Sequence, residues 1–179
     1  MEPDEGEFAY VFIDAADPGK TVRGLVTKLR DVDRDDVRVW FATDVAGAYE
    51  GFAVVQASEL KQLQDFLQEE LWADAKESHL EGGKGVRPAK RDTCDFLGIV
   101  RIRTKHGESQ AVFETLNALV ESDTQYHGVS MIFGRFDILL TLDASDMEIL
   151  KSLVMGLQTM DGLEGIVRTE TSFADCREL

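Results

Sequence analysis

A few side chains have the types and spacing that chemistry requires. The segment 17–21, Asp-Pro-Gly-Lys-Thr, lies between a predicted strand and a predicted helix, where a phosphate-binding P-loop would end. Such a loop works because glycines let backbone N–H groups surround the phosphates, and the first glycine position holds Asp14, which would repel them. Pro18 and Thr21 are also ordinary residues at a helix start. We therefore interpret the segment as the beginning of a helix.

An acidic run is the next candidate, for a calcium site. Asp31, Asp33 and Asp35 have the spacing of the first ligands of a calcium loop. Asp36 stands where the sharp turn needs glycine, and Ala42 stands where a bidentate glutamate is needed. We interpret the run as a solvated acidic turn between a helix and a strand.

Histidines and cysteines give no recognised constellation. His79, His106 and His127 have neither HxxxH nor HExxH spacing, so the sequence predicts no metal site and no cofactor. Cys94 and Cys176 are too few for a disulfide framework, and we interpret them as ordinary thiols that flank neighbouring strands. No serine lies in a nucleophile elbow, and nothing indicates a catalytic residue. These patterns predict a protein that is not an enzyme.

The elements that would position such residues occur twice in the chain. Residues 47–67 align without a gap over residues 134–154, at a spacing of 87 residues from Gly47 to Gly134. The same spacing places apolar residues 25, 26 and 29 over 112, 113 and 116, and the strand-like segment 9–13 over 96–100. Agreement over so many kinds of position predicts a tandem duplication.

Each copy predicts the element order βαββαβ. In the second copy, residues 96–103, 129–133, 138–142 and 166–173 have strand patterns, and a hairpin turn joins the middle two. Apolar residues at helical spacing follow residue 112, and Ser145-x-x-Glu148 predicts a capping box for a second helix. In the first copy Ser58 would cap the equivalent helix, while the last strand, 75–81, is polar and weakly patterned.

The segment 82–91, GGKGVRPAKR, separates the copies. Its glycines, proline and basic residues are typical of a solvated hinge, with a small anion-binding patch as the alternative. We therefore expect a first repeat at 1–81, a linker at 82–91 and a second repeat at 92–179. Because helices cover only one face of such a sheet, the other face needs a partner. The predicted fold is α+β, with two tandem ferredoxin-like units packed sheet to sheet as an intramolecular dimeric α/β barrel.

Composition narrows the classes of function. The chain has 179 residues, 44% of them hydrophobic, and 34 acidic against 19 basic side chains give a net charge of −15. That hydrophobic content excludes a disordered acidic tail, and the charge argues against direct nucleic-acid binding. The start, MEPDEGEF, lacks the regions of a signal peptide, and no apolar run could span a membrane. We expect a cytoplasmic protein without membrane association.

Two segments of the second copy carry a family resemblance. They are 131–142, MIFGRFDILLTL, with the helix after it, and 165–171, GIVRTET. Together they resemble the effector-binding domain of the Lrp/AsnC family, also called RAM, over about residues 95–173. The resemblance reaches residues 8–72 only through the repeat. Members of that family carry an N-terminal helix-turn-helix, whereas seven mostly acidic residues precede the first predicted strand here.

The resemblance implies a small-molecule site at the Gly-x-aromatic-acid turns. Family members bind small effectors, often amino acids, near this turn at subunit interfaces. The matched ligand-binding positions are Gly134, Phe136 and Asp137 in the second copy, with Gly47, Tyr49 and Glu50 in the first. A carboxylate could hold an ammonium, glycine permits close approach, and the aromatic ring supplies an apolar wall. The simpler alternative is that glycine makes the turn, the ring packs in the core and the acid caps backbone N–H groups.

The sequence therefore predicts a non-enzymatic, amino-acid-type effector-binding or regulatory protein, without direct DNA binding. Two alternatives stay open. One is a small monooxygenase-like enzyme of the dimeric α/β-barrel class that uses His106 or His127. The other is a structural module that joins chains into homo-oligomers.

Overall fold

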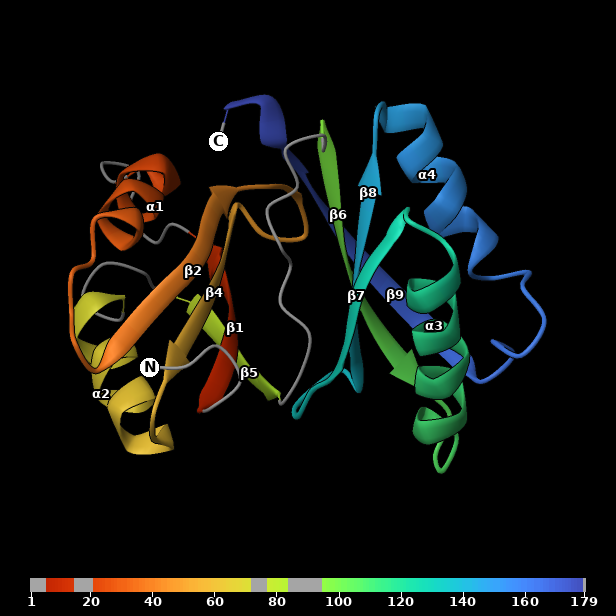
Figure 1. The fold of residues 1–179 in the computed structure, drawn as a ribbon, viewed down its shortest axis with the longest axis horizontal. Helices are drawn as coiled ribbons and strands as arrows, with labels where there is room; N and C mark the ends of the chain where they lie inside the picture. Colours follow the sequence, from red (N-terminus) through yellow and green to blue (C-terminus); the bar gives the residue numbers. More distant parts are fainter. Residues whose placement is uncertain (1–5, 15–20, 72–76, 84–94, 179) are drawn as a thin grey trace. The chain divides into compact units, whose positions relative to one another are not determined.

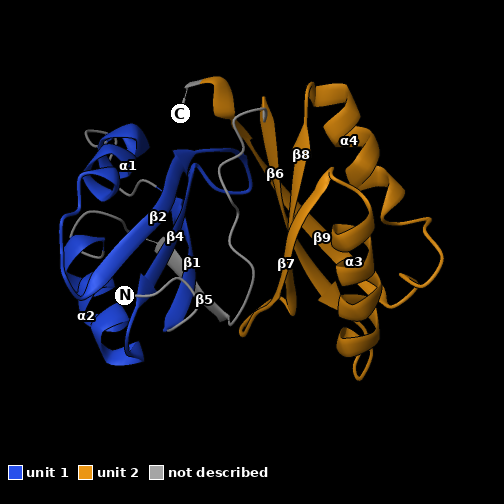
Figure 2. Cartoon of the chain, viewed as in Figure 1, with its two compact units in different colours: residues 1–84 blue, residues 85–179 orange. Residues whose placement is uncertain are grey.

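The protein is described by a computed structural model that covers residues 6–14, 21–71, 77–83 and 95–178. The chain divides into two compact units, residues 1–84 and residues 85–179 (Figure 2). Most of the predicted linker, together with Cys94, lies outside the described residues. Gly82 and Gly83, which we expected in that linker, belong instead to the last strand of the first unit.

The first unit is an antiparallel sheet with two helices. Its elements are β1 (Glu7–Asp14), α1 (Val22–Arg30), β2 (Val37–Asp44), β3 (Ala46–Gly47), β4 (Gly51–Ala57), α2 (Leu60–Glu70) and β5 (Glu77–Gly83). The strand order is β2-β4-β1-β5, and α1 and α2 cover one face of the sheet (Figure 1). The weakly patterned last strand therefore forms, two residues later than predicted.

The second unit repeats this plan. Its elements are β6 (Phe96–Thr104), α3 (Ser109–Ser122), β7 (Tyr126–Met131), β8 (Ile138–Ala144), α4 (Met147–Gly156), β9 (Ile166–Asp175) and the 3-10 turn Cys176–Glu178. Antiparallel pairing gives the order β9-β6-β8-β7, with α3 and α4 on one face (Figure 1). The predicted α+β class is confirmed, with two sheets and four helices in the part of the chain that the structure describes.

Each unit has a hydrophobic core between its sheet and its helices. In the first unit, alternate residues of β1 and β4 pack against buried residues of both helices, among them Leu29 and Phe66. In the second unit, Val100, Ile102 and alternate residues of β8 pack against Leu116 and Leu150. Close packing extends to the backbone at Gly98, because a Cβ there would lie 2.9 Å from Leu150 Cδ1.

The spacing of 87 residues recurs in the geometry of both units. Helix α2 begins at Leu60 and α4 at Met147, and their N-caps are Glu59 and Asp146. The caps are thus one residue later than the predicted Ser58 and Ser145. Asp146 Oδ1 accepts from the amides of residues 148 and 149, each at 2.9 Å, which satisfies donors at the helix start.

The first strands depart from this spacing. Ile13 of β1 lies opposite Gly51, whereas Ile102 of β6 lies opposite Ile138. The two strands therefore correspond at a spacing of 89 residues, and the ungapped alignment predicted for 9–13 is wrong by two residues. The connection from strand to helix is shorter in the second unit, and sequence patterns locate such a gap poorly because it falls in a loop.

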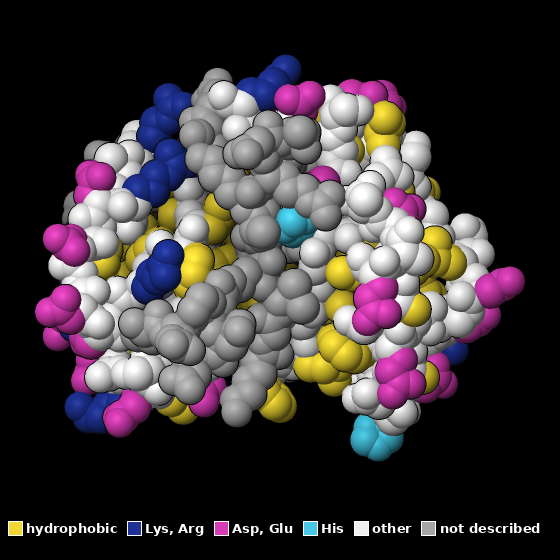
Figure 3. Space-filling view, viewed as in Figure 1, with side chains coloured by type: hydrophobic (Ala, Val, Ile, Leu, Met, Phe, Trp, Pro, Cys, Tyr) yellow, Lys and Arg dark blue, Asp and Glu magenta, His cyan; other side chains and the backbone are white. Residues whose placement is uncertain are grey.

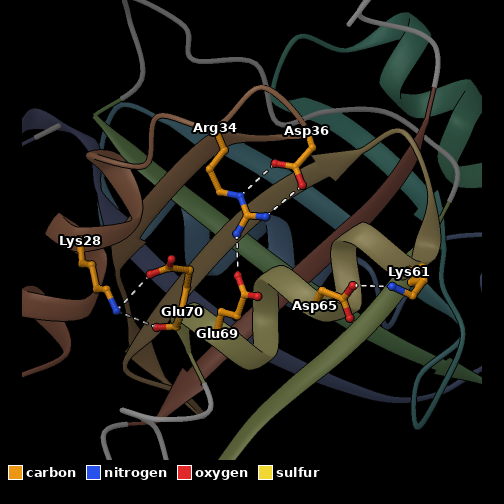
Figure 4. Close-up of polar contacts among 7 residues, drawn as sticks. All are labelled: Lys28, Arg34, Asp36, Lys61, Asp65, Glu69 and Glu70. Atoms are coloured by element: carbon orange, nitrogen blue, oxygen red, sulfur yellow. Dashed lines mark hydrogen bonds and ion pairs between the residues drawn. The ribbon is translucent and has the colours of Figure 1, made fainter.

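Acidic side chains are scattered over the visible surface of both units (Figure 3). Several are paired on the first unit: Arg34 donates to Asp36 and to Glu69, Lys28 pairs with Glu70, and Lys61 with Asp65 (Figure 4). Exposed pairs of this kind contribute little each, about 0–1 kcal/mol. No described helix has the length and apolar character needed to cross a membrane.

The Arg34 contact predicts an altered titration of Asp36. Both carboxylate oxygens of Asp36 accept from the guanidinium at 2.9 Å, and this holds the pKa of Asp36 below its ordinary value. The pair's stabilising effect is present above the ordinary aspartate pKa and is lost as the pH falls through the lowered one. We expect Arg34→Ala to raise the pKa of Asp36 toward that of a free aspartate, as measured by NMR titration. An unchanged pKa would contradict the contact.

Candidate functional site

The far face of the second unit's sheet, meaning the face opposite α3 and α4, is unusually polar. Side chains alternate between faces along a strand, so the core positions Val100 and Ile102 place Arg101 on the far face. Cross-strand register adds the residues opposite these positions. The polar residues on this face that are buried or nearly so are Arg101, His127, Ser130, Thr141, Asp143, Glu170 and Ser172.

A β-bulge in β7 brings His127 onto this face. The pairing of β7 with β8 shifts between Tyr126 and Gly128, so His127 is the extra residue of the bulge. A bulge redirects the side chains next to it, which is why bulges often occur at functional sites. Tyr126 stays on the helix side, where burial raises the pKa of its phenol.

His127 and Asp143 form a buried pair. Nδ1 of His127 lies 3.2 Å from Oδ2 of Asp143, an ion-pair contact without the alignment of a hydrogen bond. The His127 side chain is only 4% exposed, and its Nε2 has no hydrogen-bond partner among the described residues. A buried nitrogen without a partner costs about 1–3 kcal/mol, so its presence points to a function.

The equivalent place in the first unit holds a different pair. β2 has the same bulge, between Val39 and Phe41, with Trp40 as the extra residue, at the same spacing of 87. Trp40 Nε1 donates to Gln56 Oε1 at 2.7 Å, and Gln56 corresponds to Asp143. The fold therefore accepts a neutral, fully hydrogen-bonded pair at this position. The imidazole and carboxylate of the second unit are not needed to form the bulge.

The predicted residues of the second turn lie together between β7 and β8. Gly134 has a φ of +139°, a conformation that side chains rarely adopt, so the turn itself explains the glycine. Phe136 is buried. Asp137 Oδ2 accepts from the Thr104 amide at 2.8 Å and from its hydroxyl at 3.1 Å. These contacts match the simpler alternative, and ligand contact by these residues stays a prediction.

The first turn repeats part of this geometry. Gly47 has a φ of +142°, and Tyr49 is buried with its ring 5.3 Å from that of Phe12. Glu50 is exposed, and its backbone amide donates to the carbonyl of Ile13. Any role of these residues in ligand contact is likewise a prediction.

Sequence patterns missed a cluster of arginines beside the second turn. We call Arg101, Arg135 and Arg168 the arginine cluster, because their guanidiniums converge on the carboxylate of Glu170. Arg101 is 2% exposed, and its guanidinium lies 4.7 Å from the centre of the Phe136 ring. The apolar pattern of β6 conceals Arg101, since only the register with β9 brings it beside Glu170.

Other candidates on the second unit are less developed. A shallow pocket of about 320 Å³ lies between the loop after α4 and the start of β9, where Arg168 lines it. His106 is exposed in the connection before α3, and Cys176 is a free thiol. Within the described ranges no three metal-ligating side chains gather to hold an ion.

Comparisons with known proteins address the fold. No protein-family model matches the sequence, and a search of the curated proteins finds no match. Solved structures do match. An anthrone oxidase-like protein aligns with a TM-score of 0.66 and 7% identity, covering 97% of this chain and 92% of its own. A siroheme decarboxylase aligns at 0.64 and 7%, covering 93% and 70%. A mutant chlorite dismutase from Candidatus Nitrospira defluvii aligns at 0.60 and 14%, covering 98% and 94%.

These comparisons overturn the family assignment. The Lrp/AsnC effector-binding interpretation is wrong, and with it the expected role in transcription regulation, because the similar structures are of other kinds. The physical reason lies in the turn: glycine with positive φ, a buried aromatic and an acid beside backbone amides are what this hairpin requires. The motif thus reports the hairpin and not a family.

The expectation of a non-enzymatic protein is contradicted as well. The matched structures are named mostly as enzymes, so they favour the alternative of a small enzyme in the dimeric α/β-barrel class. The absence of a nucleophile elbow or a metal motif misled the prediction. Enzymes that rely on a cofactor need few residues of their own for chemistry, and these residues follow no fixed sequence spacing.

Proposed function

We propose that this protein is an enzyme that binds a heme-type iron tetrapyrrole on the far face of the second unit's sheet, with His127 as the iron ligand. The observation that carries this proposal is the buried His127 imidazole, whose Nε2 has no hydrogen-bond partner in the described part of the chain. The siroheme decarboxylase and the other enzymes of similar fold support it.

The chemistry of the His127–Asp143 pair suits this role. A histidine that ligates iron uses the lone pair of one nitrogen and usually directs the other toward a carboxylate, which orients the ring and raises its basicity. Here Asp143 Oδ2 lies beside Nδ1, so Nε2 is the nitrogen left to coordinate iron. A single protein ligand suffices, which is consistent with the lack of a three-residue metal cluster among the described residues. A bound heme would supply redox chemistry at its iron.

The far face offers further features for a flat ring. Between Asp143 and the arginine cluster, the strands place Ile99, Leu139 and Thr141 on the same face as His127. Aliphatic side chains are the usual contacts of an apolar ring system, and a few convergent polar groups fix its orientation. Helices α3 and α4 lie on the opposite face, so the core of the unit is not disturbed by a ligand here.

The proposal includes an arrangement of the whole chain. We propose two ferredoxin-like repeats, at 1–81 and 92–179 with a linker at 82–91, packed sheet to sheet as a dimeric α+β barrel. The polar far face of the second sheet would then be an interior surface, which would shield the ligand from water. The expectations of a cytoplasmic protein, without direct nucleic-acid binding and with homo-oligomers left open, stay part of this proposal.

Titration of the purified full chain with hemin tests the proposal. We expect one hemin for each chain, because Trp40 in the first unit cannot ligate iron, and a spectrum typical of histidine coordination. His127→Ala should abolish that spectrum, and added imidazole should restore it by occupying the vacated position. Asp143→Asn should weaken hemin affinity by about 10- to 100-fold, as the loss of a supporting carboxylate usually does.

His106→Ala is the matched control. His106 is an exposed histidine of the same unit, so its removal changes the histidine content without touching the far face. We expect its hemin spectrum and affinity to equal those of the unmodified protein. A protein that binds no hemin, or a His127→Ala variant with an unchanged spectrum, would refute the assignment of the iron ligand.

A further inference from the structure

We infer that the arginine cluster binds the carboxylate groups of the ligand, and that the ligand is therefore a ring compound with acidic side chains. This inference rests on the proposed function, whose site it extends. It concerns Arg135 and Arg168, with Arg101 and Glu170 as the groups that position them.

The contacts show one acid organising several bases. Arg168 Nη2 lies 2.6 Å from Glu170 Oε1, and Arg101 Nη2 lies 2.6 Å from Glu170 Oε2. Arg135 Nη2 is 3.6 Å from Glu170 Oε1, beyond direct hydrogen bonding. Each guanidinium has five N–H donors in a planar fork, more than one shared carboxylate can accept. The cluster is thus suited to bind a further carboxylate.

The charge of the cluster is opposite to that of the protein. Three guanidiniums face one carboxylate, in a chain whose formal net charge is −15. Arg103 adds to this excess, since it lies opposite Arg168 in the register of β6 and β9 and is exposed. Such a local concentration of positive charge would attract an anionic ligand toward this end of the sheet.

The first unit indicates that the fold does not require these charges. Phe12 occupies the place of Arg101, and its ring lies 5.3 Å from that of Tyr49, just as the Arg101 guanidinium lies 4.7 Å from the Phe136 ring. Burying an arginine is costly, and an apolar residue in its place is often neutral or stabilising. Because the repeat forms with an aromatic pair here, the arginine of the second unit needs another explanation, and binding an anion supplies it.

The position of the cluster matches the proposed iron site. Arg101 lies in the cross-strand row of Leu139, and Asp143 is four residues farther along β8, about 13 Å at the rise of a strand. Both are on the far face. One end of the face therefore holds the imidazole and the other holds the guanidiniums. A flat ring with carboxylates at one edge would meet both.

Exposure decides which residues can be changed without unfolding the protein. The side chains of Arg135 and Arg168 are each 54% exposed, whereas Arg101 is buried. Arg135→Ala and Arg168→Ala should therefore leave the fold intact. Arg23→Ala on α1 removes the same charge from an exposed position of the first unit and serves as the matched control.

The test compares hemin with hemin dimethyl ester, which keeps the iron but lacks free carboxylates. We expect the unmodified protein to bind hemin about 10- to 100-fold more tightly than the ester, the effect of a lost charge-assisted contact. Arg135→Ala and Arg168→Ala should weaken hemin binding by a similar factor and leave ester binding unchanged. Arg23→Ala should bind both as the unmodified protein does.

The outcomes separate the two proposals. Equal affinity for hemin and ester, with no effect of the arginine substitutions, overturns the inference while the histidine spectrum upholds the proposed function. Failure of the unmodified protein to bind either compound overturns both. Weaker binding of hemin and ester alike in the arginine variants also overturns the inference, because it would show a general disturbance of the site.

Discussion

Replacing Glu170 with leucine is expected to lower the free energy of unfolding by about 3 kcal/mol or more. The substitution removes the carboxylate to which the buried Arg101 donates, at 2.6 Å, and leaves that positive charge with less compensation. Breaking one side of a buried ion pair costs more than the pair contributes, because the remaining charge stays in a medium of low polarity. Urea denaturation followed by circular dichroism measures the change.

The paired substitution should reverse this loss. We expect the double variant Arg101→Phe, Glu170→Leu to unfold at a free energy equal to or above that of the unmodified protein, since Phe12 occupies the equivalent place in the first unit. Glu148→Leu, at an exposed position of α4, is the control and should change stability by less than about 0.5 kcal/mol. A double variant as unstable as Glu170→Leu would contradict the view that Arg101 is kept for binding and not for stability.

Sequence patterns predicted those features that depend on local chemistry and on repetition. The alternation of apolar residues gave the strands, and the spacing of 87 residues is seen again in the bulges at Trp40 and His127. The last strand of the first unit was hard to predict because β5 is polar and short of apolar residues. Its pairing with β1 comes from tertiary structure, which can override weak local propensity.

The candidate site was largely hidden from sequence reasoning. His127 carries no motif, and its relation to Asp143 arises from a bulge and a cross-strand contact that connect residues 16 apart. Arg101 and Glu170 are 69 residues apart and become neighbours only through strand register. The repeat held one usable signal: aligning the copies sets Trp40 over His127 and Gln56 over Asp143, an exchange of neutral groups for titratable ones.

Replacing a core leucine at matched positions of the two units is expected to lower the free energy of unfolding by about 2–5 kcal/mol in each case. Leu29 of α1 and Leu116 of α3 are both fully buried and lie at the spacing of 87 residues. In each unit the leucine packs against the sheet, so alanine would leave a cavity. Leu60→Ala, at an exposed position at the start of α2, is the control and should have little effect.

The signal that reports this loss also tests the proposed packing of the units. Both tryptophans, Trp40 and Trp72, lie in the first unit, so fluorescence reports the unfolding of that unit alone. If the sheets pack face to face as proposed, the units unfold together. Leu116→Ala, although it lies in the second unit, should then lower the fluorescence midpoint as much as Leu29→Ala does. A fluorescence midpoint that Leu116→Ala leaves unchanged, while circular dichroism shows a second and earlier transition, would mean that the units unfold independently, and the shared barrel would have to be abandoned.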